Sequence, residues 1–222
     1  MVDFSLTLSI NSDDLKIIKA ATLRITLAKL VNFEINVGES MAISSFTASL
    51  IWLVFEPFPY NNITWNEEYS IYCSSQFELT KGTVISKISQ TDYPAIDASY
   101  YSFTSNGLFD GPFTDSNSPP SGAYKVNNNM PNTQYPALTF GLQQKASING
   151  QNIPQSPLNA SVVPSTYPIT FAPSNIVYVW LQTPLSSGTV ISKLPEKFTE
   201  VTFQDNPIKG SSGIVMQIIN LK

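Results

Sequence analysis

Apolar and polar positions alternate with a period of two along much of the chain, which is the pattern of strands with one buried face. Near the N-terminus, Leu6, Leu8 and Ile10 alternate with hydroxyl side chains, and the same period returns over residues 23–31. Both segments are therefore predicted to be strands. Further strands are expected at residues 33–37, 41–46, 48–55, 68–74, 82–88 and 100–104.

A short segment between the first two strands predicts a helix instead. Ser12 precedes the acidic pair Asp13 and Asp14, and apolar residues then follow at helical spacing. A hydroxyl side chain caps the free N–H groups of a first turn, and acidic residues there face the positive end of the helix. We expect a helix over about residues 13–20.

The chain also repeats itself at a constant offset of 106 residues. Residues 63–87 align without a gap onto residues 169–193, with 11 identities among 25 positions. Six of these are consecutive, because residues 82–87 and 188–193 both read GTVISK. A shared register over this length indicates one module present twice. A turn and a strand that are needed twice explain the match, and ligand contact is the alternative.

These patterns predict an all-β fold with minor α content, consisting of two duplicated β-sandwich-like domains and one short N-terminal helix. The first domain is expected at residues 1–110 and the second at residues 111–222. Because residues 105–136 are rich in Gly, Pro and Asn, the second domain is expected to begin with a linker that extends to about residue 136.

Composition and charge exclude several classes of protein. The net charge is −4 and the 12 basic residues are scattered, whereas nucleic-acid-binding proteins cluster Lys and Arg. The single Cys73 cannot form an internal disulfide, which fits a reducing compartment. The N-terminus lacks a basic region ahead of an apolar core, and the most apolar run, residues 48–55, is too short to cross a bilayer. We therefore expect a cytoplasmic or non-classically released protein that engages neither nucleic acid nor membrane.

Catalytic chemistry has few candidates, and no catalytic residue is predicted. His is absent, which removes the commonest general base, the Ser-His-acid triad and nearly all transition-metal sites. Glu67 and Glu68 are adjacent in an expected strand and point to opposite faces, so they do not form a carboxylate pair. We expect a protein without enzymatic activity. Carboxylates distant in sequence remain an alternative, and so does a hard-cation site of Asp, Glu and Asn oxygens, so a bound metal ion stays open.

Side chains with flat or adaptable apolar surfaces are the candidates for ligand contact. They are Trp65, Tyr72, Tyr178, Trp180 and Met130. Aromatic rings that carry a hydroxyl or N–H group suit a stacked sugar or an extended conjugated molecule. Trp180 has no Trp at the corresponding position of the first copy, which favours one site over two equal sites. The alternative for each residue is a packing role, with a Tyr hydroxyl bonded to a backbone group and Met as core filler.

Two segments carry a resemblance to a known group of proteins. Residues 21–32 read ATLRITLAKLVN and residues 62–72 read NITWNEEYSIY. Together with the acidic helix start, they resemble small leaderless fruiting-body proteins of mushroom-forming fungi. That group includes the pink chromoproteins of oyster mushrooms, which are similar in size and hold a conjugated pigment non-covalently. The resemblance implies a non-covalent conjugated organic chromophore in this chain.

Three functions follow, in order of preference. The first is non-enzymatic binding of an extended, conjugated, apolar pigment by a homodimer that encloses it; the resemblance implies the pigment, and low charge, many aromatic residues and the lack of a catalytic set agree with it. The second is a glycan-binding lectin or defence protein. The third is a membrane-active toxin, indicated by the apolar stretch with interspersed Ser and Thr at residues 41–55.

Overall fold

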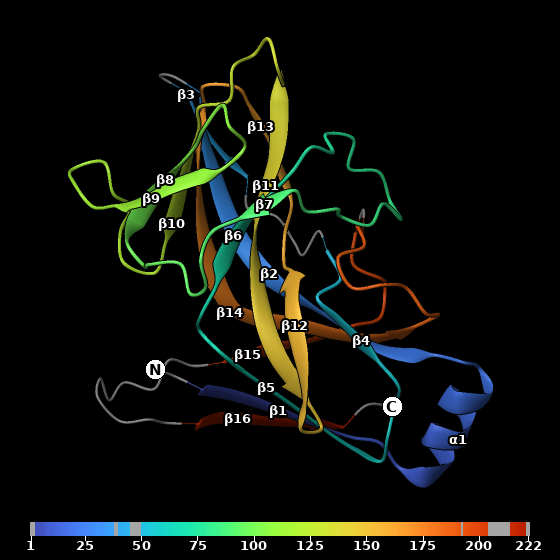
Figure 1. Cartoon of the computed structure of the whole chain (residues 1–222). Coiled ribbons are helices and arrows are strands. Elements are labelled where there is room, and N and C mark those ends of the chain that lie inside the picture. Colours follow the sequence, from blue (N-terminus) through green and yellow to red (C-terminus); the bar gives the residue numbers. More distant parts are fainter. Residues whose placement is uncertain (1–2, 38–39, 45–49, 192, 204–213, 221–222) are drawn as a thin grey trace.

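The computed structural model describes residues 3–37, 40–44, 50–191, 193–203 and 214–220 of the protein. These residues form two β-sheets and one short helix near the N-terminus (Figure 1), so the prediction of an all-β fold with minor α content is confirmed. The first sheet, named sheet A, contains β1 (Asp3–Ser9), β5 (Tyr60–Asn66), β6 (Ser70–Ser74), β7 (Ser89–Gln90), β11 (Ala137–Ile148), β12 (Gln151–Pro157), β13 (Ser161–Pro164) and β16 (Ile214–Asn220). The second sheet, named sheet B, contains β2 (Arg24–Val37), β3 (Ser40–Ser44), β4 (Leu53–Phe55), β8 (Ser99–Phe103), β9 (Phe109–Phe113), β10 (Tyr124–Asn128), β14 (Pro168–Gln182) and β15 (Thr199–Thr202).

The helix, α1 (Ser12–Ala20), lies where it was predicted but has a different cap. Asn11 is the N-cap, and its side-chain oxygen accepts hydrogen bonds from the backbone N–H groups of Asp13 at 3.1 Å and Asp14 at 2.9 Å. The prediction of Ser12 as cap is wrong by one residue, because an Asn side chain at the preceding position makes the same bonds. The helix α1 contacts the core through buried Ile18 and partly buried Leu15.

Two predicted segments differ from the structure. Residues 82–88 form no strand, since Val84 makes only an isolated antiparallel bridge and β7 begins at Ser89. The predicted linker contains β9 and β10, and β10 buries Tyr124 and Val126 on one face. That short period-two pattern is hidden in the sequence by the surrounding Gly and Pro. Residues 45–49, which belong to the strands expected at 41–46 and 48–55, lie outside the described residues.

The strand register shows the sequence duplication in three dimensions. In sheet A, β1 runs antiparallel to β5 with Phe4 opposite Trp65, and in sheet B, β10 runs antiparallel to β14 with Tyr124 opposite Phe171. Because Trp65 and Phe171 are aligned positions of the repeat, β10 is the second-copy counterpart of β1. The duplication therefore extends well beyond the segment in which the sequence reveals it.

The same comparison identifies the other counterparts. Gly141 of β11 lies opposite Tyr72 of β6, and Ala28 of β2 lies opposite Tyr178 of β14. Since Tyr72 and Tyr178 are aligned in the repeat, β11 is the counterpart of β2. Corresponding places are also held by β3 and β12, β4 and β13, β7 and β15, and β8 and β16.

The two copies interleave instead of forming separate sheets. Sheet A combines β1, β5, β6 and β7 of the first copy with β11, β12, β13 and β16 of the second. Sheet B combines β10, β14 and β15 of the second copy with β2, β3, β4 and β8 of the first, and β9 is an addition at its edge. The predicted boundary at residue 110 lies within β9, and each copy completes its sheets with strands from the other.

The two GTVISK hexapeptides meet each other. Val190 donates its backbone N–H to the carbonyl of Thr83 at 2.8 Å, and Val84 lies opposite Thr189. Each pair joins a Thr of one copy to the Val of the other, so the contact is symmetric and marks the pseudo-twofold axis between the copies. The Gly that opens each hexapeptide has a positive φ, 91° and 77°, which Gly adopts without strain. The sequence match therefore has a structural cause at this axis.

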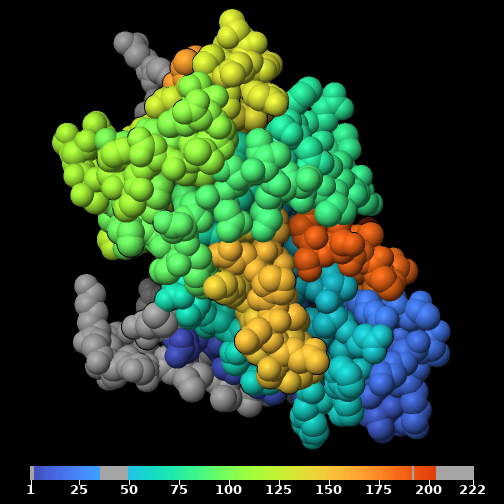
Figure 2. All heavy atoms as spheres, viewed as in Figure 1, coloured from blue at the N-terminus to red at the C-terminus, as the bar shows by residue number. Residues whose placement is uncertain are grey.

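The inner faces of the sheets share one core. Phe4 and Phe140 of sheet A and Leu27 and Phe171 of sheet B belong to the same cluster of buried side chains. In Figure 2, the red-orange segment that follows β14 lies against the cyan segment that contains β4, in agreement with the bond from Ile51 N to Thr189 O at 3.0 Å. Within the described ranges, no helix combines the length and apolar character that crossing a membrane requires.

Candidate functional site

A groove of about 790 Å³ lies on the outer face of sheet A. Alternate residues of β1 and β5 point there, away from the core: Ser5 and Thr7 on β1, and Asn62 and Thr64 on β5. Ser147 of β11 continues this row of hydroxyl and amide side chains. The other lining residues are Asp3, Phe4, Trp65, Asn66, Glu68, Tyr93, Lys145, Ala146 and Asn152. The groove therefore has a polar floor that rigid strands position.

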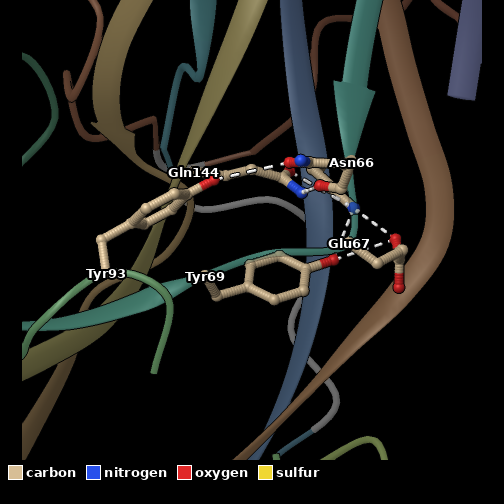
Figure 3. A network of polar contacts seen from close by, with 6 residues as sticks. Asn66, Glu67, Tyr69, Tyr93 and Gln144 are labelled. Atoms are coloured by element: carbon tan, nitrogen blue, oxygen red, sulfur yellow. Dashed lines mark hydrogen bonds and ion pairs between the residues drawn. The ribbon is translucent and has the colours of Figure 1, made fainter. Parts of the chain in front are cut away.

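One part of the groove is organised around Tyr93. The ammonium nitrogen of Lys145 lies 3.9 Å from the centroid of the Tyr93 ring, a cation–π contact. The Tyr93 hydroxyl donates to Asn66 Oδ1 at 3.4 Å, and Asn66 Nδ2 donates to Glu68 Oε2 at 3.1 Å. Figure 3 shows the Tyr93 side chain directed toward Asn66 and the Tyr69 side chain directed toward Glu67. A cation, a phenol, an amide and a carboxylate are thus held in one network.

The Tyr93 phenol acts as a hydrogen-bond donor at neutral pH. Burial raises the pKa of Tyr93 to about 12, and the nearby Glu68 carboxylate acts in the same direction. The hydroxyl is therefore protonated at pH 7, where it donates to the amide oxygen of Asn66.

This part of the groove depends on a break between β5 and β6. β5 ends at Asn66, and Gln144 Nε2 donates to the Asn66 carbonyl at 2.6 Å. Glu68 lines the groove and Glu67 lines a different cleft. The two carboxylates therefore face different spaces, but they lie between β5 and β6 and not within one strand as expected. In the second copy the corresponding stretch lies inside the single strand β14, with Pro173 in place of Glu67.

A buried charge lies between the sheets behind this break. The Lys29 side chain is 1% exposed, and its ammonium group donates to Glu67 Oε1 at 3.1 Å, the Tyr69 hydroxyl at 2.7 Å and Gln144 Oε1 at 3.3 Å. Burial lowers the pKa of Lys29, and the charge and hydrogen bond of Glu67 oppose this shift. Burial and the Glu67 charge raise the pKa of Tyr69. The counterpart of Lys29 in the second copy is Leu142, so the chain has this ion pair at one of the two related positions.

The five predicted ligand residues are distributed over three apolar clusters. Trp65 and Met130 belong to the main core, Tyr178 and Trp180 to a second cluster, and Tyr72 to a third. All five are at most 5% exposed. Trp65 also lines the groove, as the core side chain beneath its floor. The structure does not bring the five together around one cavity.

Tyr72 has a close packing role. Its hydroxyl donates to the carbonyl of Asn159 at 2.5 Å, and its ring lies against Gly141. A Cβ at Gly141 would lie 2.7 Å from Tyr72 Cε1 and would overlap the Asn159 carbonyl oxygen. Gly at this position therefore makes room for a buried Tyr whose hydroxyl bonds the backbone.

A second hollow, of about 740 Å³, is mainly apolar. Its walls include Phe55, Phe58, Pro59, Tyr60 and Ile148. The Phe58 and Tyr60 side chains are exposed, at 46% and 75%. This apolar pocket offers flat surfaces to a hydrophobic ligand.

Sequence reasoning missed Lys29, Tyr93 and Lys145. Lys29 falls on the inward face of an alternating strand, between Leu27 and Val31, and that position was a usable signal of a buried charge. Tyr93 and Lys145 lie far apart in sequence and meet only through tertiary structure. The sequence therefore held no local signal for their contact.

The described residues contain no group of three or more His, Cys, Asp and Glu side chains placed to hold a metal ion. Cys73 is buried as a free thiol, and burial raises its pKa, so it is no nucleophile at neutral pH. Comparison with known proteins finds no family model, no curated protein and no solved structure that matches this chain.

Proposed function

We propose that the protein is a non-enzymatic binding protein that holds a glycan in the groove on sheet A. The observation that carries this proposal is the polar row of Ser, Thr and Asn side chains on the groove floor beside Tyr93, Lys145 and Glu68. Sugars present rings of hydroxyl groups, which amide, hydroxyl and carboxylate side chains bind through paired donors and acceptors. Strands hold such groups at fixed spacing, which reduces the entropy lost on binding.

The Lys145–Tyr93 contact adds specificity to the proposed site. Lys145 is exposed and lies over the phenol ring, so either its ammonium group or the ring face that it covers becomes available when it shifts. An ammonium group pairs with the carboxylate of an acidic sugar, and a ring face stacks on a neutral one. No covalent step is proposed, because the chain has no His and the one thiol is buried.

A glycan array that contains neutral and acidic sugars tests the proposal, followed by calorimetric titration of each sugar that binds. Lys145→Ala and Asn62→Ala are expected to weaken binding about tenfold each, since each removes polar contacts worth about 1.4 kcal/mol. Lys125→Ala is the matched control, because Lys125 lies 6.0 Å from the Tyr100 ring on the other sheet and outside the groove. An array without binding above background contradicts the proposal, and so does an equal loss of affinity in Lys125→Ala.

A second candidate is binding of a conjugated apolar pigment, the function implied by the resemblance to fungal chromoproteins. The apolar pocket of Phe55, Phe58, Pro59, Tyr60 and Ile148 supports it, since flat exposed rings suit an extended conjugated molecule. A visible absorption band in protein from its native source, with the pigment extractable into organic solvent, supports this candidate. Colourless protein without extractable small molecule removes it.

The other functional hypotheses stay predictions. The membrane-active hypothesis rested on residues 41–55, of which 45–49 lie outside the described residues, while Leu50, Ile51, Trp52 and Leu53 are at most 1% exposed. A homodimer and a cytoplasmic or non-classically released location agree with a soluble binding protein and stay part of the proposal.

A further inference from the structure

The buried amine of Lys29 lies against a side-chain amide on the opposite sheet. Its nitrogen is 3.3 Å from Oε1 of Gln144, and Lys29 belongs to β2 of sheet B whereas Gln144 belongs to β11 of sheet A. The contact therefore crosses the core between positions 115 residues apart in sequence. A neutral amine is a nucleophile and an amide carbonyl is an electrophile, so this pair contains both reactants of an amide exchange.

A carboxylate is present to move the protons of such a reaction. Glu67 Oε1 is 3.1 Å from the Lys29 nitrogen, which is the distance of direct proton transfer along a hydrogen bond. The Tyr69 hydroxyl accepts from Lys29 at 2.7 Å, donates to Glu67 at 3.0 Å and also hydrogen-bonds the side chain of Gln144. In Figure 3 the ends of the Glu67, Tyr69 and Gln144 side chains converge on one region. Nucleophile, base and electrophile are therefore in contact.

The surroundings of Lys29 favour its neutral form over those of a surface lysine. The side chain is 1% exposed, and burial lowers its pKa, although the charge and hydrogen bond of Glu67 oppose this shift. The ring centroids of Tyr69 and Trp65 lie 5.0 Å and 5.9 Å from the nitrogen. Low-polarity walls of this kind raise the free energy of the ammonium form and of any water that competes with the amine.

The amide of Gln144 is held with its carbonyl toward the amine. The residue is fully buried, and its Nε2 donates to the backbone carbonyl of Asn66 at 2.6 Å. Its own backbone carbonyl accepts from the Trp52 indole N–H at 3.5 Å. Reactants that a fold holds in contact react with a high effective concentration, because the entropy of bringing them together has already been lost on folding.

We propose that Lys29 and Gln144 form an intramolecular isopeptide bond that joins β2 to β11. Glu67 takes one proton from the ammonium group, and the free amine attacks Cδ of Gln144, so that an Nζ–Cδ bond forms. The Cδ–Nε2 bond then breaks, and the departing nitrogen takes a second proton from the amine and the proton held by Glu67. It leaves as ammonium through the polar cleft that Glu67 and Tyr69 line.

The products balance without any other reactant. The chain loses one ammonia molecule and one positive charge, Glu67 returns to its carboxylate form, and no oxidant, reductant or ligand of the groove takes part. The ion pair between Lys29 and Glu67 is the state before the reaction, and a chain in that state is called unlinked. Linkage restrains the unfolded chain, because it closes a loop between positions 115 residues apart.

The protein contains a second Lys–Gln contact that serves as an internal comparison. Lys87 Nζ donates to Gln143 Oε1 at 2.5 Å and to the backbone carbonyl of Gln155 at 3.4 Å. Lys87 is exposed, and none of the ion pairs between described residues involves it. Proximity alone would link Lys87 to Gln143, whereas the proposed reaction needs the buried carboxylate and links only Lys29 to Gln144.

The test is the intact mass of the full-length chain, measured under denaturing conditions after prolonged incubation at neutral pH. The expected mass is lower than that of the sequence by one ammonia molecule. A protease digest is expected to contain the Lys29 peptide joined to the Gln144 peptide, which distinguishes the bond from a succinimide at Asn106 or Asn149, since each precedes a Gly and would lose the same mass. In denaturing electrophoresis the linked chain should migrate faster, because its closed loop keeps it more compact.

Three variants test the role of the carboxylate. Glu67→Gln keeps an acceptor for Lys29 but removes the base, and it is expected to keep the full mass. Tyr69→Phe keeps the ring but removes the hydroxyl between carboxylate and amide; it is expected to slow the loss of ammonia and replaces Glu67→Gln if that variant does not fold. Lys87→Ala is the matched control and is expected to lose ammonia as the unsubstituted chain does. The proposal is overturned if the unsubstituted chain keeps its full mass, if Lys87 is the joined residue, or if folded Glu67→Gln links Lys29 as completely as the unsubstituted chain.

Discussion

Removal of either partner of the buried ion pair between Lys29 and Glu67 is expected to lower the stability of the unlinked protein, but by unequal amounts. Glu67→Ala leaves a buried ammonium group with only the neutral acceptors of Tyr69 and Gln144. Lys29→Met removes the buried charge and fills its space with an unbranched apolar side chain. The second copy has Leu142 at the related position, so an apolar residue is compatible with this place in the fold. We expect Glu67→Ala to be the more damaging change, although Glu67 is the more exposed partner.

The magnitude follows from the burial of each partner. Loss of one member of a buried pair typically costs about 3 kcal/mol when the other stays behind as a buried charge. In Glu67→Ala the group left behind is Lys29, whose side chain is 1% exposed. In Lys29→Met the group left behind is Glu67, whose side chain is 34% exposed and can be hydrated. We therefore expect Lys29→Met to cost about 1 kcal/mol, mainly from the lost hydrogen bond to Gln144. The difference of about 2 kcal/mol is roughly thirtyfold in the unfolding equilibrium constant.

Urea unfolding of the two variants and of the double variant measures these free energies. The double variant is expected to resemble Lys29→Met, because no charge is then left buried. In Glu67→Ala the pKa of Lys29 falls further below its usual value of 10.5, since Glu67 opposed the effect of burial. Between the lowered pKa of Lys29 in the folded state and about pH 10.5, the folded state then binds fewer protons than the unfolded state. The stability of this variant therefore rises with pH over that range. The reasoning is refuted if Lys29→Met costs as much as Glu67→Ala, or if the double variant is as unstable as Glu67→Ala.

Three further outcomes are expected. Gly141→Ala should destabilise the protein by about 3 kcal/mol in thermal or urea unfolding, because the Cβ of the new Ala would collide with the Asn159 carbonyl and the Tyr72 ring. A loss of stability below about 1 kcal/mol would contradict this geometry. Stability should fall as pH rises above 10, because the pKa values of buried Tyr69 and Tyr72 are raised in the folded state and only the unfolded state then releases those protons. Stability that stays constant up to about pH 11 would contradict the burial of these phenols. Cys73 should react with a thiol reagent at neutral pH only as fast as the protein unfolds, and rapid labelling of the folded protein would show that the thiol is accessible.

Local sequence patterns predicted the elements of this fold but not how they pair. The helix after Asn11 and the strands expected near the N-terminus and at residues 23–37 lie close to their expected places, whereas the strand expected at residues 82–88 is absent and the described part of that expected at residues 48–55 is reduced to Leu53–Phe55. The repeat predicted two copies of one module, and the structure has counterparts for most strands of each copy. Nothing local specifies that β2 pairs with β14 and β11 with β5 and β6, because hydrogen bonding between strands is the same whichever copy supplies the partner.

The candidate site was harder to predict than the fold. Trp65 and Tyr72 are prominent in the sequence as aromatic residues, but aromatic side chains are also what a β-sheet core is made of, and the structure buries both. The floor of the groove is a row of small polar residues, each of which looks ordinary in the sequence. Its chemistry arises from strands β1, β5 and β11 lying next to each other, which depends on sheet order.

Interleaving of the copies has a consequence for how the chain folds during its synthesis. β2 cannot find its antiparallel neighbour β14 until residues 168–182 have left the ribosome, and β5 waits in the same way for β11. The first half therefore emerges with long unpaired strand edges, at a synthesis rate of about 5–20 residues per second. Such edges are templates for association with other nascent chains. We expect a chain truncated before β14 to aggregate, whereas two half-chains produced together would complete each other's sheets.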